Sequence, residues 1–178
     1  MKTALILYFS STGNTEKVAQ AIRLGLEQAG MLVTVKKPKE AANVDYFDFD
    51  LVCVGSPAIQ WHPVKELDDL LKAKLDIYRG QGKIKPLAPK VAGKNALIFV
   101  TYSGAHTGLD EATPAGKYLA QFFAHIGFNI VGEWYILSEY CGNLENSTKG
   151  KMGDIRGKPT GEDLLRIMQD AQTLALKI

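Results

Sequence analysis

The chain has 178 residues, of which 46% are hydrophobic and 22% are charged, and these values are ordinary for one folded globular domain. A net charge of +2 gives no support to a nucleic-acid binder or a protein that adheres to membranes through charge. The two cysteines, Cys53 and Cys141, have neither the CxxC pattern nor a metal-type spacing, so we expect no disulfide framework and no metal site.

The N-terminal apolar run ends at Ser10 without a cleavage-like site, and a strand explains it better than a signal peptide. No apolar stretch approaches the roughly 20 residues that a transmembrane helix needs. We therefore expect a cytoplasmic protein with no membrane span and no nucleic-acid partner, in which residues 1–178 form a single domain.

Short apolar runs alternate with segments of helical periodicity along the whole chain. The apolar runs predict strands at residues 4–8, 32–35, 51–55, 96–101 and 129–137. The periodic segments predict helices over residues 18–29, 63–75, 113–126 and 160–175. Because the strands are almost continuously apolar, they favour a parallel sheet covered by helices on both faces, which is an open α/β fold.

Two connections are unusually long, at residues 79–94 and 138–158. The first contains five basic residues, and no acidic residue lies between Ile77 and Leu109. A solvated connection explains this composition, and the alternative is a surface for an acidic partner or for the phosphates of a nicotinamide nucleotide. The second connection either folds over a ligand or contributes to a homodimer contact.

In an open parallel sheet, ligands bind beyond the carboxyl ends of the strands. The first loop at that edge combines hydroxyls with a glycine and an amide directly before a helix: Ser10, Ser11, Thr12, Gly13, Asn14 and Thr15. A helix N-terminus attracts phosphate, and small polar residues let a phosphate approach the backbone. The loop lacks GxxxxGK[ST] and GxGxxG, so it supports neither a P-loop hydrolase nor a standard dinucleotide turn. We interpret it as a monophosphate site, and the simpler alternative is a capped helix start after a polar turn.

The stretch from Ser10 to Thr15 resembles the FMN phosphate loop of the flavodoxin family, whose pattern is T/S-x-T-G-x-T. The order of the expected elements resembles the same family over essentially the whole chain. This resemblance implies a flavodoxin-like, doubly wound, five-stranded parallel sheet in the order 2-1-3-4-5, with helices on both faces and non-covalently bound FMN. A Gly-x-x-x-Gly-x-x-Glu-Ala stretch beginning at Gly104 is similar to that of many flavodoxin-like proteins without a characterised function.

The resemblance also implies that the loop after the third strand contacts the isoalloxazine ring. Its candidate residues are Ser56, Pro57, Ala58, Ile59 and Trp61. Trp61 has the flat surface that stacks well on a flavin. Alternatively, Trp61 covers the sheet edge or anchors the helix that starts at Pro63, and Ile59 contacts the ring instead.

The loop after the fourth strand is expected, by the same resemblance, to hold the pyrimidine end of the flavin through its backbone. The candidate residues are Thr101, Tyr102, Ser103, Gly104, His106 and Gly108. Its two glycines permit tight turns. Tyr102 stacks on the ring or fills space below the loop. His106 donates a hydrogen bond near flavin N1 and the C2 carbonyl, or it is an ordinary surface histidine. We expect Glu111 to stabilise the start of the following helix.

These interpretations converge on FMN-dependent redox chemistry, in which the flavin carries the reaction. The protein is either a small NAD(P)H-dependent reductase of a quinone-like acceptor or an electron carrier for a redox partner protein. Electron-carrying flavodoxins are typically acidic, and a sequence pI near 8.4 weakens the carrier assignment. The alternative is a non-enzymatic flavin- or phosphate-binding interaction module. No residue is assigned as catalytic, and Cys141 lacks a visible resolving cysteine.

Overall fold

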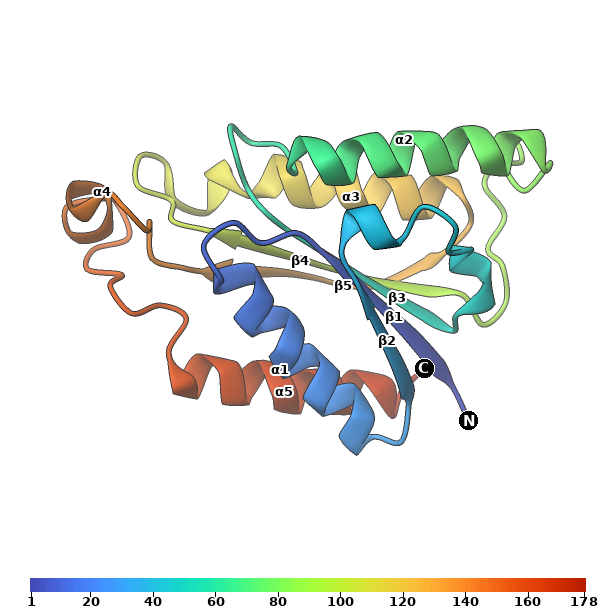
Figure 1. Cartoon of the computed structure of the whole chain (residues 1–178), viewed down its shortest axis with the longest axis horizontal. Coiled ribbons are helices and arrows are strands. Elements are labelled where there is room, and N and C mark those ends of the chain that lie inside the picture. Colours follow the sequence, from blue (N-terminus) through green and yellow to red (C-terminus); the bar gives the residue numbers. More distant parts are fainter.

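Five parallel strands form one sheet in the order β2-β1-β3-β4-β5 in the computed structural model, which describes residues 1–178 (Figure 1). The strands are β1 (Thr3–Tyr8), β2 (Leu32–Lys36), β3 (Leu51–Pro57), β4 (Asn95–Tyr102) and β5 (Asn129–Leu137). The helices are α1 (Asn14–Gln28), α2 (Lys65–Gly80), α3 (Thr113–His125), α4 (Leu144–Thr148) and α5 (Gly161–Ala175). The strand order expected from the sequence is confirmed. None of the helices combines the length and the apolar character needed to cross a membrane.

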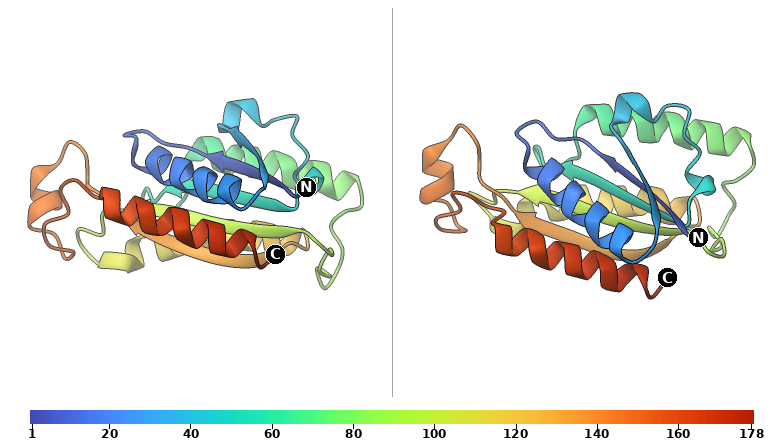
Figure 2. Two further views of the ribbon diagram at one scale, coloured as in Figure 1. Left: turned by 90° about the horizontal axis from the view of Figure 1, so that it is seen from below. Right: turned by 60° about the horizontal axis from the view of Figure 1, so that its bottom comes forward.

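Helices cover both faces of the sheet, as the continuously apolar strands predict. One face carries α1 and α5, which lie side by side, and the other carries α2 and α3 (Figures 1 and 2). Successive side chains of β1 alternate between two cores: Leu5 and Leu7 join the core under α2 and α3, whereas Ile6 joins the core under α1 and α5. Each strand therefore needs apolar residues at consecutive positions.

All strands run in the same direction, so their carboxyl ends meet at one edge of the sheet. The loops that leave β1, β3, β4 and β5 gather there, near α4 in Figure 1. Residues 81–94 connect α2 to the start of β4 and lie at the opposite edge, near the chain termini (Figure 1). The eight residues of β4 separate the two edges by about 26 Å at about 3.3 Å per residue. This placement argues against the basic connection as the phosphate site of a nicotinamide nucleotide that reacts at the carboxyl edge.

The connection at 138–158 is a closed loop that contains α4, a helix the sequence did not predict. At its base, the Glu139 N–H donates to the Lys158 carbonyl at 3.0 Å. Near its far side, the Lys151 N–H donates to the Ala105 carbonyl at 2.8 Å, which attaches this connection to the loop after β4. The segment is therefore held at both its base and its tip.

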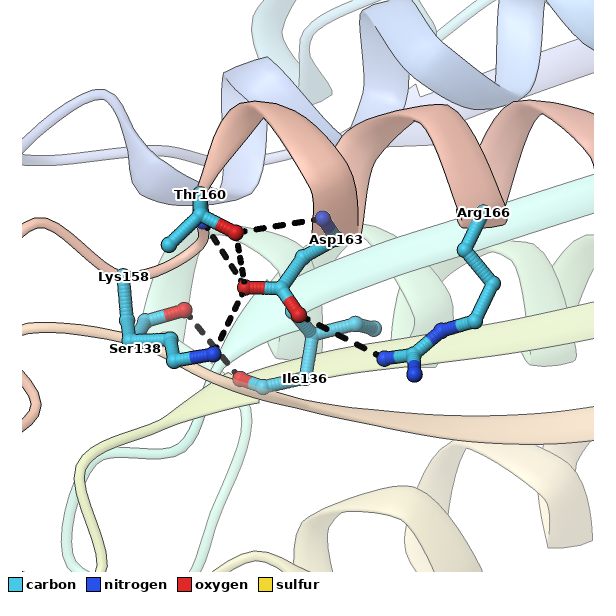
Figure 3. Close-up of polar contacts among 6 residues, drawn as sticks. All are labelled: Ile136, Ser138, Lys158, Thr160, Asp163 and Arg166. Atoms are coloured by element: carbon cyan, nitrogen blue, oxygen red, sulfur yellow. Dashed lines mark hydrogen bonds and ion pairs between the residues drawn. The ribbon is translucent and has the colours of Figure 1, made fainter.

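The N-terminus of α5 is closed by a capping box formed by Thr160 and Asp163 (Figure 3). The Asp163 N–H donates to the Thr160 hydroxyl oxygen at 3.2 Å, and Asp163 Oδ2 accepts the Thr160 N–H at 2.8 Å. Asp163 Oδ2 also accepts a hydrogen bond from Lys158 Nζ at 2.9 Å. Burial raises the pKa of Asp163, but the hydrogen bonds from Thr160 and Lys158 outweigh it and lower that pKa to about 2.

We expect Asp163→Asn to lower the free energy of unfolding by about 1 kcal/mol at neutral pH, because it removes the charged half of the capping box. The folded-state pKa of Asp163 lies below the ordinary value of 3.8. Asp163 therefore contributes its full stabilisation of the folded protein at pH values above 3.8. This stabilisation is lost as the pH falls through about 2. Urea unfolding of both proteins across this pH range measures the difference, which should shrink with acid. Asp170→Asn, on the exposed face of α5, is the control, and a pH-independent difference would contradict the assignment.

Candidate functional site

A cleft of about 500 Å³ opens at the carboxyl edge of the sheet, a volume in the usual range for small-molecule sites. Four loops line it, after β1, β3, β4 and β5. The lining residues are Ser11, Thr12, Asn14, Thr15, Pro57, Ala58, Ile59, Gln60, Thr101, Tyr102, Ser103, Glu111, Ser138, Glu139, Tyr140 and Cys141. Three of the walls contain residues that the sequence predicts for a cofactor site.

The first loop presents unpaired donors to the cleft. Gly13 has a φ of 93°, which favours glycine, and its N–H donates to the Ser10 hydroxyl oxygen at 3.1 Å within the turn. The remaining N–H groups around the start of α1 have no acceptor in the protein; they belong to Ser11, Thr12, Asn14, Thr15 and Glu16. The Ser11 and Thr12 hydroxyls also have no protein partner. Several neutral donors at a helix N-terminus, with no carboxylate lining this wall, form a donor set that fits a phosphate monoester.

Two side chains of the same loop connect it to other walls of the cleft. The Thr15 hydroxyl lies 2.7 Å from the Thr101 hydroxyl at the end of β4, and both residues are buried. Asn14 Nδ2 donates to the Glu139 carbonyl at 3.1 Å, after β5. Asn14 and Thr15 therefore fix the position of the loop, and Ser11 and Thr12 keep their hydroxyls free for a ligand.

The second loop makes a tight turn from Ile59 to His62. The backbone groups of Ile59 and His62 form two hydrogen bonds. The Ile59 N–H donates to the His62 carbonyl at 2.9 Å, and the His62 N–H donates to the Ile59 carbonyl at 3.0 Å. Gln60 and Trp61 occupy the centre of the turn with φ values of 49° and 68°, a conformation that costs non-glycine residues about 1 kcal/mol or more each. The turn leaves the side chains of Ile59 and Trp61 50% and 59% exposed. Strained turns of this kind concentrate at ligand sites.

Three predicted contacts of the first two loops lie behind the cleft wall rather than in it. Ser56 is completely buried, and its hydroxyl accepts the Val64 N–H at 3.1 Å and donates to the Pro57 carbonyl at 2.8 Å. Ser10 bonds within its own turn, and Gly13 lines no part of the cleft. These residues shape the loops, and Ser10 keeps its own hydroxyl hydrogen, which donates to no acceptor in the protein.

A second pocket of about 320 Å³ adjoins the cleft, and the two share Ala58, Gln60 and Glu111. Its other lining residues are Trp61, His106 and Thr107. The structure thus brings Trp61 and His106 together, beside the main cleft and not within it.

The third loop is held in place by one carboxylate and two glycines. The Gly108 N–H donates to the Gly104 carbonyl at 3.1 Å, and the φ values of these residues are 76° and 60°. Glu111 Oε1 accepts the N–H groups of His106 at 2.6 Å and Thr107 at 2.7 Å. The expectation that Glu111 stabilises the start of α3 is therefore wrong, because its carboxylate reaches back to the loop.

Tyr102 lines the cleft with its ring half-buried, and burial raises the pKa of its hydroxyl. Its carbonyl accepts the Ser138 N–H at 2.8 Å. Tyr102 therefore both presents a ring surface to the cleft and connects the wall after β4 to the wall after β5.

Sequence reasoning missed six lining residues: Gln60, Glu111, Ser138, Glu139, Tyr140 and Cys141. Four of them follow β5, where no distinctive composition marks a site. The available signals were the length of the connection at 138–158, for which folding over a ligand was one alternative, and the topology, since the end of the fifth strand must reach the same edge as the other strands.

The family model described as "Flavodoxin domain" matches residues 5–81, which include the first two walls of the cleft. This match is confined to residues 5–81, and the strand order β2-β1-β3-β4-β5 extends the similarity to the fold of the whole chain. The chain has a flavodoxin-like α/β fold.

Relatives and solved structures are similar to this chain over most of its length. A protein of Rhizobium rhizogenes named NAD(P)H dehydrogenase (quinone) is 27% identical over 166 residues, covering 82% of this chain and 77% of the relative. Oxidised flavodoxin 1 of Bacillus cereus superposes with a TM-score of 0.68 at 16% identity, covering 98% of this chain and 97% of the other. A flavodoxin of Streptococcus pneumoniae TIGR4 gives a TM-score of 0.62 at 21% identity, with 99% of each chain covered. The two structures establish similarity of fold.

Proposed function

We propose that the cleft binds FMN, with the phosphate on the first loop and the isoalloxazine ring between the second and third loops. Proteins of the flavodoxin family typically bind this cofactor. The observation that carries the proposal is the group of N–H and hydroxyl donors around Thr12 that have no acceptor in the protein and line an open cleft. The seventeen contacts expected from the sequence remain the proposed set, within which Gly13 and Ser56 act by shaping the loops.

When bound, the flavin supplies hydride and single-electron chemistry, and the protein binds it and adjusts its electrostatics. Ser11 and Thr12 donate hydrogen bonds to the phosphate. Tyr102 and Trp61 supply flat surfaces near the ring. Glu111 holds the His106 and Thr107 N–H groups in one orientation, so the third loop keeps a fixed backbone towards the pyrimidine end.

We further propose an NAD(P)H-dependent reductase of a quinone-like acceptor. The name of the Rhizobium rhizogenes relative supports this class. The pocket of about 320 Å³ beside the cleft supports it independently, because Trp61 and His106 there offer a flat apolar surface and a polar group to a second small molecule. We retain as proposals a single domain over residues 1–178, a cytoplasmic location, no nucleic-acid partner and a homodimer.

The absorption spectrum of the purified protein and a fluorescence titration with FMN test the cofactor proposal. We expect a yellow protein that releases FMN on denaturation, or an apoprotein that binds FMN at micromolar concentrations. A protein that does neither contradicts the cofactor proposal.

Anaerobic stopped-flow mixing of the FMN-bound protein with NADH and with NADPH tests the reductase proposal separately. We expect rapid two-electron bleaching, followed by reoxidation on addition of a quinone. FMN binding without any bleaching, together with a stable semiquinone on chemical reduction, would instead indicate an electron carrier.

A further inference from the structure

A separate pocket of about 440 Å³ lies at the amino edge of the sheet, opposite the cleft. Residues of the connection from α2 to β4 form one side, and the end of α3 forms the other (Figure 1). Its lining residues are Phe47, Gly82, Lys83, Lys85, Ala88, Pro89, Lys90, Val91, His125, Ile126 and Gly127. We call it the amino-edge pocket.

Every ionisable side chain that lines the amino-edge pocket is basic. Lys83 forms an ion pair with Asp45 at 2.6 Å, so its charge is compensated. Lys85 and Lys90 form no ion pair, and no carboxylate lines the pocket. The pocket therefore holds two uncompensated ammonium groups, which favour an anion.

The backbone after α3 binds one of these two ammonium groups and leaves the other free. The Gly127 carbonyl already accepts the Val91 N–H at 2.9 Å, and the Phe128 carbonyl accepts Lys90 Nζ at 2.7 Å. Lys85 Nζ has no hydrogen-bond acceptor in the protein. It is the donor most available to a ligand, and an ammonium group suits a phosphate as a point charge.

The pocket also has an apolar component formed by Phe47, Val91 and Ile126. The Phe47 ring is fixed by edge-on packing against Tyr78 and Phe128, with 5.1 Å between ring centroids in each pair. Since an inorganic ion would leave this surface unused, a ligand with a flat or aliphatic body complements the pocket better than phosphate alone.

We propose that the amino-edge pocket is a second ligand site, which binds a small organic phosphate of about the size of a mononucleotide. A ligand there lies about the length of β4, roughly 26 Å, from the cleft. Its binding therefore depends neither on the flavin nor on the reductase proposal. Lys85 and Lys90 contact the phosphate, and Phe47 and Val91 contact the body of the ligand.

The test is an NMR titration of the amide resonances of the full chain with AMP, adenosine and ribose 5-phosphate, in the presence and absence of FMN. We expect saturable shifts at Gly82, Lys85 and Gly127 with AMP. Adenosine should bind more weakly because it lacks the phosphate, and ribose 5-phosphate because it lacks the flat body. Shifts confined to the cleft, or no saturable shift with AMP, would overturn the proposal whatever FMN does.

Lys85→Glu tests the key contact, because the Lys85 ammonium makes no contact whose loss would unfold the protein. We expect it to weaken AMP binding at least ten-fold. Lys39→Glu makes the same change of charge at an exposed residue outside the pocket and should leave AMP binding unchanged. Equal affinities for AMP in the two variants would show that net charge alone attracts the nucleotide, and would overturn the site.

Discussion

Replacing Ser11 by alanine and Thr12 by valine together lowers the affinity for FMN about 100-fold and leaves the free energy of unfolding almost unchanged. Both hydroxyls line the cleft, and neither has a partner in the protein. A hydrogen bond to a charged group contributes about 1.5 kcal/mol or more. Losing two of them removes about 3 kcal/mol, which corresponds to the expected change in affinity. Fluorescence titration with FMN and urea unfolding measure the two quantities.

Two control variants locate the effect. Thr173→Val makes the same substitution at an exposed site on α5 and should bind FMN normally. Thr15→Val removes a hydroxyl that is bonded to Thr101, so it should lower stability as well as affinity. If the Ser11 and Thr12 variant bound FMN as tightly as the unmodified protein, the phosphate site would lie elsewhere.

Replacing Gly104 by alanine destabilises the protein by about 2 to 3 kcal/mol and lowers FMN affinity about ten-fold. A Cβ atom on Gly104 would lie 2.8 Å from the Gly108 carbonyl oxygen and 2.9 Å from the Gly108 Cα, and Gly104 has a φ of 60°. Both contacts are with backbone atoms, which cannot rotate away. The third loop must therefore open, and its hydrogen bond from the Gly108 N–H to the Gly104 carbonyl is lost.

Gly30→Ala separates the backbone strain from the close contact. Gly30 also has a positive φ, 84°, but a Cβ atom there meets nothing within 4 Å. We expect about 1 kcal/mol of destabilisation and unchanged FMN affinity in this control. Equal losses of stability in the two variants would mean that the third loop tolerates the added methyl group. Urea unfolding and FMN titration of each protein provide the comparison.

The open α/β sheet could be predicted because the relevant information is local and repeated, whereas the strand order came from the resemblance to the flavodoxin family. The run Leu51–Val54, for example, is apolar at every position because both faces of β3 are covered, and the alternation of strands with helices limits the topology. The capping box at Thr160 and Asp163 also follows from local chemistry. Residue type and spacing along the chain determine such features.

For the site, the sequence predicted which residues lie near a ligand, but it did not predict which groups their side chains contact. Ser56 has the composition of a ligand contact, but its hydroxyl points to the Val64 N–H, because the start of α2 needs an acceptor. Glu111 lies where an acidic residue would stabilise a helix, and it bonds two loop N–H groups instead. Neither outcome depends on spacing. Both follow from which unpaired backbone group happens to lie within reach in three dimensions.

The four walls of the cleft are joined by a continuous series of hydrogen bonds. The Ala58 N–H donates to the Thr101 carbonyl at 2.9 Å, and the links described above continue through Thr15, Asn14 and Lys151. The protein therefore already holds its loops in one preorganised arrangement. Little conformational entropy remains to be lost on binding, so most of the interaction energy of the donors can appear as affinity.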